Sequence, residues 1–121
     1  MNCSAPKTIT VDGVEYVQKE AMAMHHDGLP FVVIRATSAG VFAGWLKSRN
    51  GQECEMVDAR RLWYWAGAAS LSQLAMEGVK RPDECKFPQI VPEIVVIGVI
   101  EIIPATITAQ KSISEVPVWK R

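Results

Sequence analysis

Short runs of alternating hydrophobic and polar residues dominate the first third of the chain. Residues 8–11 and 14–17 are β-prone runs on either side of Asp12-Gly13, and this arrangement predicts a hairpin with a tight turn. Residues 18–26 contain good helix formers and predict a short helix. Residues 30–36 are rich in β-branched side chains and predict a strand.

A second hairpin is predicted around Asn50-Gly51, because both residues tolerate positive φ. Its strands are expected at residues 41–47 and 53–57. A period of two divides the first strand into two faces. One face carries Phe42, Gly44 and Leu46, and the other carries Val41, Ala43 and Trp45. Both faces are apolar, so the hairpin is either covered on both sides or forms part of an assembly interface.

The next predicted element is a short helix over residues 71–77. Ser70 and Gln73 have the spacing of a capping box, and Gly78 is a suitable end. Residues 79–92 contain three prolines and predict a loop.

The longest apolar run, residues 94–103, predicts the central strand of a sheet. It has about half of the ~20 residues that a spanning helix needs. Glu101 lies inside this run and needs a partner, for which Arg35, Arg60 and Arg61 are candidates. Residues 106–119 predict a turn of helix near 109–113 and a terminal edge strand.

Together these elements predict a small β-rich α+β domain. About six strands form a twisted sheet or a partly open barrel, with one or two short helices packed on it. The 121 residues are enough for a single domain. Residues 1–28 would form the N-terminal hairpin and short helix, and residues 29–121 the core.

Composition excludes several classes of function. The chain has 13 basic and 13 acidic residues, whereas a protein that grips phosphate backbones usually has a basic excess, so a nucleic-acid partner is not expected. The N-terminus lacks an apolar leader, and no membrane partner is expected. The three cysteines are scattered, which fits a reducing cytosol and predicts neither a metal site nor a cofactor.

An arginine–aromatic cluster is the most informative candidate site. Five of its residues fall within six positions, and a segment of small residues separates them from the sixth: Arg60, Arg61, Trp63, Tyr64, Trp65 and Ser70. Arginine pairs with phosphate, tryptophan and tyrosine stack on bases, and a helix N-terminus favours anions, so the cluster could hold a nucleotide. The alternative is that these aromatics and arginines belong to a core or a protein interface.

The sequence offers no convincing catalytic group. His25 and His26 are the two histidines, and neighbours on a helix point about 100° apart, which makes them poor co-ligands. Cys54 alternates with Met56 and is expected in the core. Glu53 and Glu55 share one face of a strand and are expected to be solvated. The prediction is therefore that the protein is not an enzyme.

Four segments resemble a family of small tailed-bacteriophage and prophage proteins classed as a domain of unknown function. These segments are Val33–Gly44, Ala59–Leu74, Cys85–Pro88 and Val116–Trp119. The resemblance implies a phage or prophage origin and supplies no activity.

Two functions follow as expectations. The first is a non-enzymatic accessory binding protein in the host cytoplasm, such as a defence antagonist that sequesters a nucleotide-derived signal or binds a host protein. The alternative is a virion structural or decoration protein. Both predict a homo-oligomer, because a neutral net charge offers little resistance to self-association.

Overall fold

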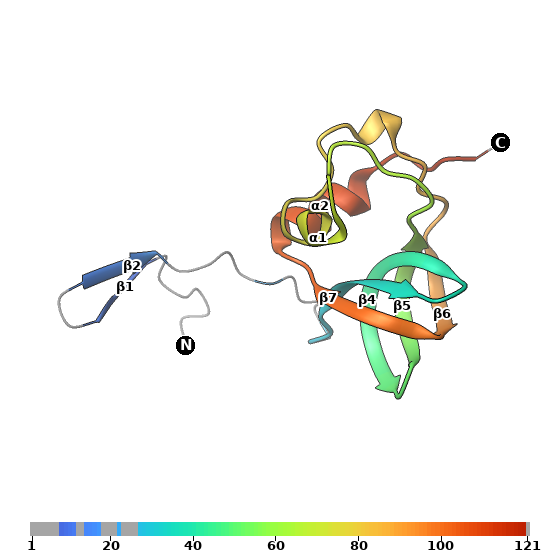
Figure 1. Cartoon of the computed structure of the whole chain (residues 1–121), viewed down its shortest axis with the longest axis horizontal. Coiled ribbons are helices and arrows are strands. Elements are labelled where there is room, and N and C mark those ends of the chain that lie inside the picture. Colours follow the sequence, from blue (N-terminus) through green and yellow to red (C-terminus); the bar gives the residue numbers. More distant parts are fainter. Residues whose placement is uncertain (1–7, 12–13, 18–21, 23–26, 121) are drawn as a thin grey trace.

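The computed structural model describes residues 8–11, 14–17, 22 and 27–120. Its main body is a five-stranded antiparallel sheet in the order β6-β5-β4-β3-β7, with two helices on one side (Figure 1). The strands are β3 Phe31–Ala36, β4 Gly40–Asn50, β5 Glu53–Arg61, β6 Val91–Ile97 and β7 Val99–Pro104. The helices are α1 Leu71–Glu77 and α2 Ile107–Glu115, and a 3₁₀ turn spans Pro82–Glu84. The sheet is not closed, and the predicted small β-rich α+β class is confirmed.

A separate two-stranded sheet lies near the N-terminus. β1 Thr8–Val11 pairs antiparallel with β2 Val14–Val17, which confirms the predicted hairpin. With this hairpin the described residues form seven strands, against the six or so expected. The helix predicted over residues 18–26 lies outside the described residues, apart from Met22.

The apolar run over residues 94–103 is two strands and not one. β6 and β7 follow each other in the chain yet occupy opposite edges of the sheet, so the prediction of one central strand is wrong. The break is at Gly98, whose φ of +84° is readily adopted only by glycine. Gly98 N–H donates to the Gln52 carbonyl at 3.0 Å, and its own carbonyl accepts from Thr37 N–H at 2.9 Å. Two hairpin turns therefore hold this corner.

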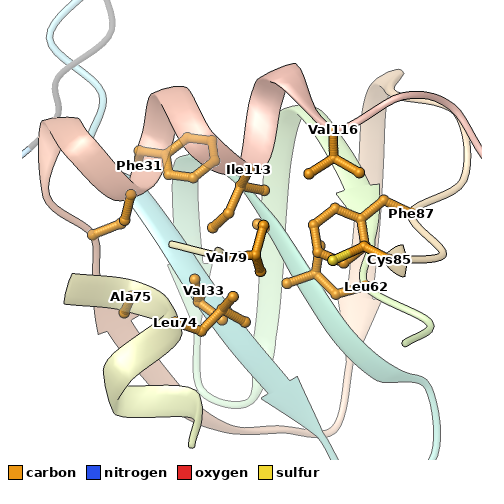
Figure 2. Close-up of a cluster of buried hydrophobic side chains, with 13 residues drawn as sticks. Phe31, Val33, Leu62, Leu74, Ala75, Val79, Cys85, Phe87, Ile113 and Val116 are labelled. Carbon is orange, nitrogen blue, oxygen red and sulfur yellow. The ribbon is translucent and has the colours of Figure 1, made fainter. Parts of the chain in front are cut away.

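Each face of the sheet carries its own hydrophobic core. The helix-side core lies between the sheet and the helices (Figure 2) and comprises Phe31, Val33, Ala43, Leu62, Leu74, Ala75, Val79, Cys85, Phe87, Ala105, Ala109, Ile113 and Val116. The strand-side core on the other face comprises Val32, Ile34, Ala36, Phe42, Cys54, Met56, Ala59, Val96 and Val99. Strand β4 contributes to both, which confirms the predicted division of residues 41–46 between two apolar faces, and each face packs against a core.

Both helices begin at hydroxyl caps. Ser70 Oγ accepts from Gln73 N–H at 3.1 Å, and the predicted bounds of α1 are confirmed. Helix α2 is longer than the single turn expected, because Thr106 Oγ1 accepts from Ala109 N–H at 3.1 Å and starts it earlier. The predicted terminal strand is reduced to one bridge between Val118 and Phe87. None of the helices in the described part of the chain is long and apolar enough to cross a membrane.

Candidate functional site

A bulge in β5 decides where the two arginines of the predicted cluster point. Between Ala43 and Trp45, β4 advances two positions while β5 advances three, from Val57 to Arg60. Asp58 takes up the extra residue with a φ of +47°. A bulge of one residue exchanges the two faces of a strand. As a result Arg60 faces the helices, on the side opposite Cys54 and Met56.

Arg60 is buried and its guanidinium binds backbone carbonyl groups. Nη1 donates to the carbonyls of Ile113 (3.1 Å) and Val116 (3.0 Å). Nη2 donates to Phe87 at 2.8 Å and Nε to Pro88 at 3.0 Å. Burial lowers the pKa of this guanidinium, and four carbonyl oxygens compensate for the lost hydration. Arg60 thereby joins β5 to the C-terminal end of α2 and to residues 87–88.

Arg61 lies on the opposite face of the sheet, against the strand-side core. Its guanidinium carbon is 4.5 Å from the centroid of the Phe42 ring, and Nη1 donates to the Ala39 carbonyl. The side chain is half-buried and lines a cavity of about 170 Å³ beside Pro88 and Gln89. Arg61 therefore reaches a hollow on the molecular surface, whereas Arg60 is enclosed.

The three aromatic residues after Arg61 have unequal exposure. Trp63 and Tyr64 are 65% and 52% exposed. Trp65 is half-buried and packs against the helix-side core. The structure thus divides the predicted aromatic cluster into two surface residues and one partly structural residue.

Two residues that the sequence interpretation did not select complete the surface around Tyr64. Lys86 pairs with Tyr64 through the backbone, its N–H donating to the Tyr64 carbonyl at 2.7 Å. Lys86 Nζ lies 5.9 Å from the Tyr64 ring centroid and 5.7 Å from that of Trp119. These are cation–π distances. We call Tyr64, Lys86 and Trp119 the aromatic–lysine surface. Lys86 and Trp119 lie in two of the segments that carry the family resemblance, Cys85–Pro88 and Val116–Trp119. The sequence therefore contained a signal that could have singled them out.

Ser70 is the N-cap of α1, and none of the hydrogen bonds of Ser70 to described residues involves Arg60 or Arg61. Ser70 Oγ caps α1, and Gln73 Oε1 accepts from Ala69 N–H at 2.8 Å.

Glu101 has an arginine partner, as the sequence analysis expected. Of the three candidates the partner is Arg35, whose Nε lies 3.1 Å from Glu101 Oε1. That pair is on the surface, with side-chain exposures of 53% and 41%, so it contributes little to stability.

Among the described residues, the other candidate groups from the sequence include one buried thiol and no metal cluster. Cys54 lies in the strand-side core as expected, and burial raises the pKa of its thiol, against a smaller opposite effect of Arg49. His25 and His26 lie outside the described residues. Within the described ranges, no cluster of three histidine, cysteine or acidic side chains could hold a metal ion.

Residues 29–113 match the family described as Domain of unknown function (DUF6948). The chain belongs to the DUF6948 family. Neither a curated protein nor a solved structure matches it significantly. The DUF6948 match contains both arginines, Tyr64 and Lys86, whereas Trp119 follows its last residue. Most of the candidate site is thus part of the DUF6948 domain, and Trp119 adds an aromatic ring from beyond it.

Proposed function

We propose that this DUF6948 protein is a non-enzymatic accessory binding protein of a tailed phage or prophage, which acts in the host cytoplasm by binding a host protein. The phage context comes from the resemblance of the four sequence segments. The observation that carries the binding role is the exposure of Trp63 and Tyr64, 65% and 52%. Large aromatic residues exposed on ordered backbone are typical of the anchors of protein interfaces.

The backbone around these side chains supports the proposal. Trp63 and Tyr64 both donate their N–H groups to the Lys86 carbonyl, at 3.1 and 3.3 Å. Phe87 in turn accepts from Trp119 N–H at 3.0 Å. Three chain segments therefore hold the aromatic–lysine surface in place before any partner arrives. A surface that is already ordered loses less conformational entropy on binding.

Cavity size favours a protein partner over a nucleotide enclosed by one copy of the chain. The cavity beside Arg61 has a volume of about 170 Å³, whereas pockets that enclose drug-sized ligands usually have ~300–1,000 Å³. At this cavity, a nucleotide-derived signal would need a second copy of the chain to enclose it. The nucleotide form of the proposal therefore requires a homo-oligomer with its ligand between subunits.

The test compares partner capture from phage-infected cells by the native chain and by the Trp63→Ala and Tyr64→Ala variants. Met76→Ala is the matched control, because Met76 is an exposed apolar side chain on α1. A host protein that both aromatic variants lose and Met76→Ala retains supports the proposal. Capture that is unaffected by the aromatic substitutions contradicts it. Native mass spectrometry and melting shifts with cyclic and ADP-ribose-type nucleotides test the nucleotide form.

A virion structural role is the second candidate, and one feature of β6 favours it. Val95 and Ile97 are 51% and 72% exposed on an edge strand of the main sheet. An exposed apolar edge strand promotes association with further chains. High-copy detection of this chain in purified particles, together with loss of a homo-oligomer on Ile97→Lys, would favour this role over host-protein binding.

A further inference from the structure

The cavity beside Arg61 combines apolar walls with one cationic group. Phe42, Pro88, Val91 and Ile94 supply apolar surface, and Arg61 and Gln89 supply the polar groups. Its volume of about 170 Å³ suits one side chain or a small organic acid. The cavity therefore selects for a fragment that is mainly apolar and ends in a group complementary to arginine.

The charge of Arg61 is not neutralised by a described carboxylate. The ion pairs among the described residues join Arg35 to Glu101, Lys47 to Glu55 and Arg81 to Glu84. Arg61 is half-buried, and it hydrogen-bonds to one backbone carbonyl, that of Ala39. Among the described residues Arg61 therefore has no carboxylate partner, and an anion that enters the cavity would gain a charge-assisted hydrogen bond from it.

The orientation of the guanidinium points to the type of anion. The guanidinium carbon lies over the Phe42 ring, and Nη1 is bound to the Ala39 carbonyl, so two contacts restrain the group. Nε and Nη2 make no hydrogen bond to a described residue. These two donors form one edge of the guanidinium fork, and a carboxylate can accept from both at once. A planar acceptor thus fits better than a spherical one.

Arg60 holds another part of the cavity lining in place. Its Nε and Nη2 hold the carbonyls of Pro88 and Phe87, and Pro88 lines the cavity next to Gln89. This part of the lining is therefore anchored from the helix side of the sheet, while Arg61 faces the cavity from the other side. A site of this kind is present before its ligand binds.

We propose that this cavity binds a carboxylate carried on a short apolar stem, presented by the polypeptide partner of the protein. The inference rests on the proposed function in one respect, which is that the partner is a protein. The carboxylate belongs either to an acidic side chain or to a chain terminus. In both cases Arg61 Nε and Nη2 are the donors, and Val91 and Ile94 contact the stem.

The first experiment titrates the isotope-labelled full chain with 4-methylpentanoate and with its neutral amide, and follows the Arg61 Nε–Hε signal by NMR. We expect saturable shifts with the acid and at least tenfold weaker binding of the amide, since a charged hydrogen-bonded pair contributes about 1.5–3 kcal/mol. Equal binding of acid and amide would overturn the proposal. Tighter binding of inorganic phosphate than of the acid would also overturn it.

Matched variants locate the effect. Arg61→Met removes the charge at similar length, Arg61→Lys keeps the charge without the planar fork, and Arg35→Met is the control on an exposed arginine. We expect the first to abolish binding of the acid, the second to weaken it, and the control to leave it unchanged. Equal loss in Arg61→Met and Arg35→Met would contradict the assignment. The folded state of each variant is checked by its urea unfolding curve.

Two peptides identify the source of the carboxylate. One is acetylated and ends in leucine with a free carboxylate, and the other is acetylated, amidated and carries a single central glutamate. The peptide that binds more tightly identifies the source of the carboxylate. If neither peptide binds, the assignment to a polypeptide is overturned. Trp63→Ala and Tyr64→Ala should retain peptide binding, so failure of the exposed aromatic pair proposed to bind the host protein is distinguishable from failure of this cavity.

Discussion

Arg60 and Arg61 are successive residues whose guanidinium groups lie against aromatic rings of opposite cores. Arg60 is 5.5 Å from the Phe87 ring centroid on the helix side, and Arg61 is 4.5 Å from that of Phe42 on the other side. The bulge at Asp58 sets which arginine takes which side. One arginine thereby becomes a structural connection and the other remains available to a ligand.

The different environments of the two arginines predict that substitution by methionine lowers the free energy of unfolding much more at Arg60 than at Arg61. Arg60→Met leaves the buried carbonyl of Val116 and the partly buried carbonyl of Pro88 without their donor. We expect the free energy of unfolding to fall by about 3 kcal/mol or more. Arg61→Met should cost about 1 kcal/mol or less, because the group is half-exposed. Urea unfolding measures both, and equal losses would contradict the structural role of Arg60.

Gly67 is predicted to be essential for the backbone turn after the aromatic cluster. Its φ is +89°, and an added Cβ would lie 2.5 Å from the Lys80 nitrogen. Gly51 is the matched control, with a φ of +62° and open space around it. We expect Gly51→Ala to cost about 1 kcal/mol for the left-handed conformation alone, and Gly67→Ala at least about 2 kcal/mol more, because backbone must move. Similar melting temperatures would contradict the close approach.

Local signals were sufficient for the elements whose ends depend on nearby residues. Asn50-Gly51 placed the β4–β5 hairpin, and Ser70 with Gln73 placed α1. The corner at Gly98 was missed because an apolar run looks alike whether it is one central strand or two edge strands. What separates the two cases is long-range, namely the hydrogen bonds to Gln52 and Thr37.

The candidate site shows the same limit. The sequence selected Arg60, Arg61 and the aromatic residues beside them, but alternation alone cannot reveal a bulge at Asp58 or the side of the sheet that each arginine faces. Lys86 and Trp119 come together with Tyr64 only through backbone pairing between distant segments. Recognition of such a surface needs the tertiary structure.

The three clustered aromatic residues are predicted to differ in stability and in binding. Trp63→Ala and Tyr64→Ala should change the free energy of unfolding by less than about 0.5 kcal/mol, because both side chains are mainly exposed. Trp65→Ala should cost about 2 kcal/mol, since its ring packs against the helix-side core. Thermal unfolding measures the difference. Sedimentation of the same variants tests whether the cluster lies at a subunit interface. If it does, the substitutions should give a monomer or a smaller oligomer than the native chain forms.

Cys54 is predicted to make stability fall at alkaline pH. Burial raises the pKa of its thiol in the folded state, whereas in the unfolded chain it titrates near its ordinary value of ~8.5. Between these two values the folded state holds a proton that the unfolded state has lost, so the free energy of unfolding falls as pH rises. Urea unfolding at pH 7.5 and 9.5 should show a larger loss in the free energy of unfolding for the native chain than for Cys54→Ala.

The same raised pKa predicts slow alkylation of Cys54 in the folded chain at pH 8, measured by peptide mapping against the urea-unfolded chain. Equal alkylation rates in the folded and unfolded chains would contradict the burial of this thiol.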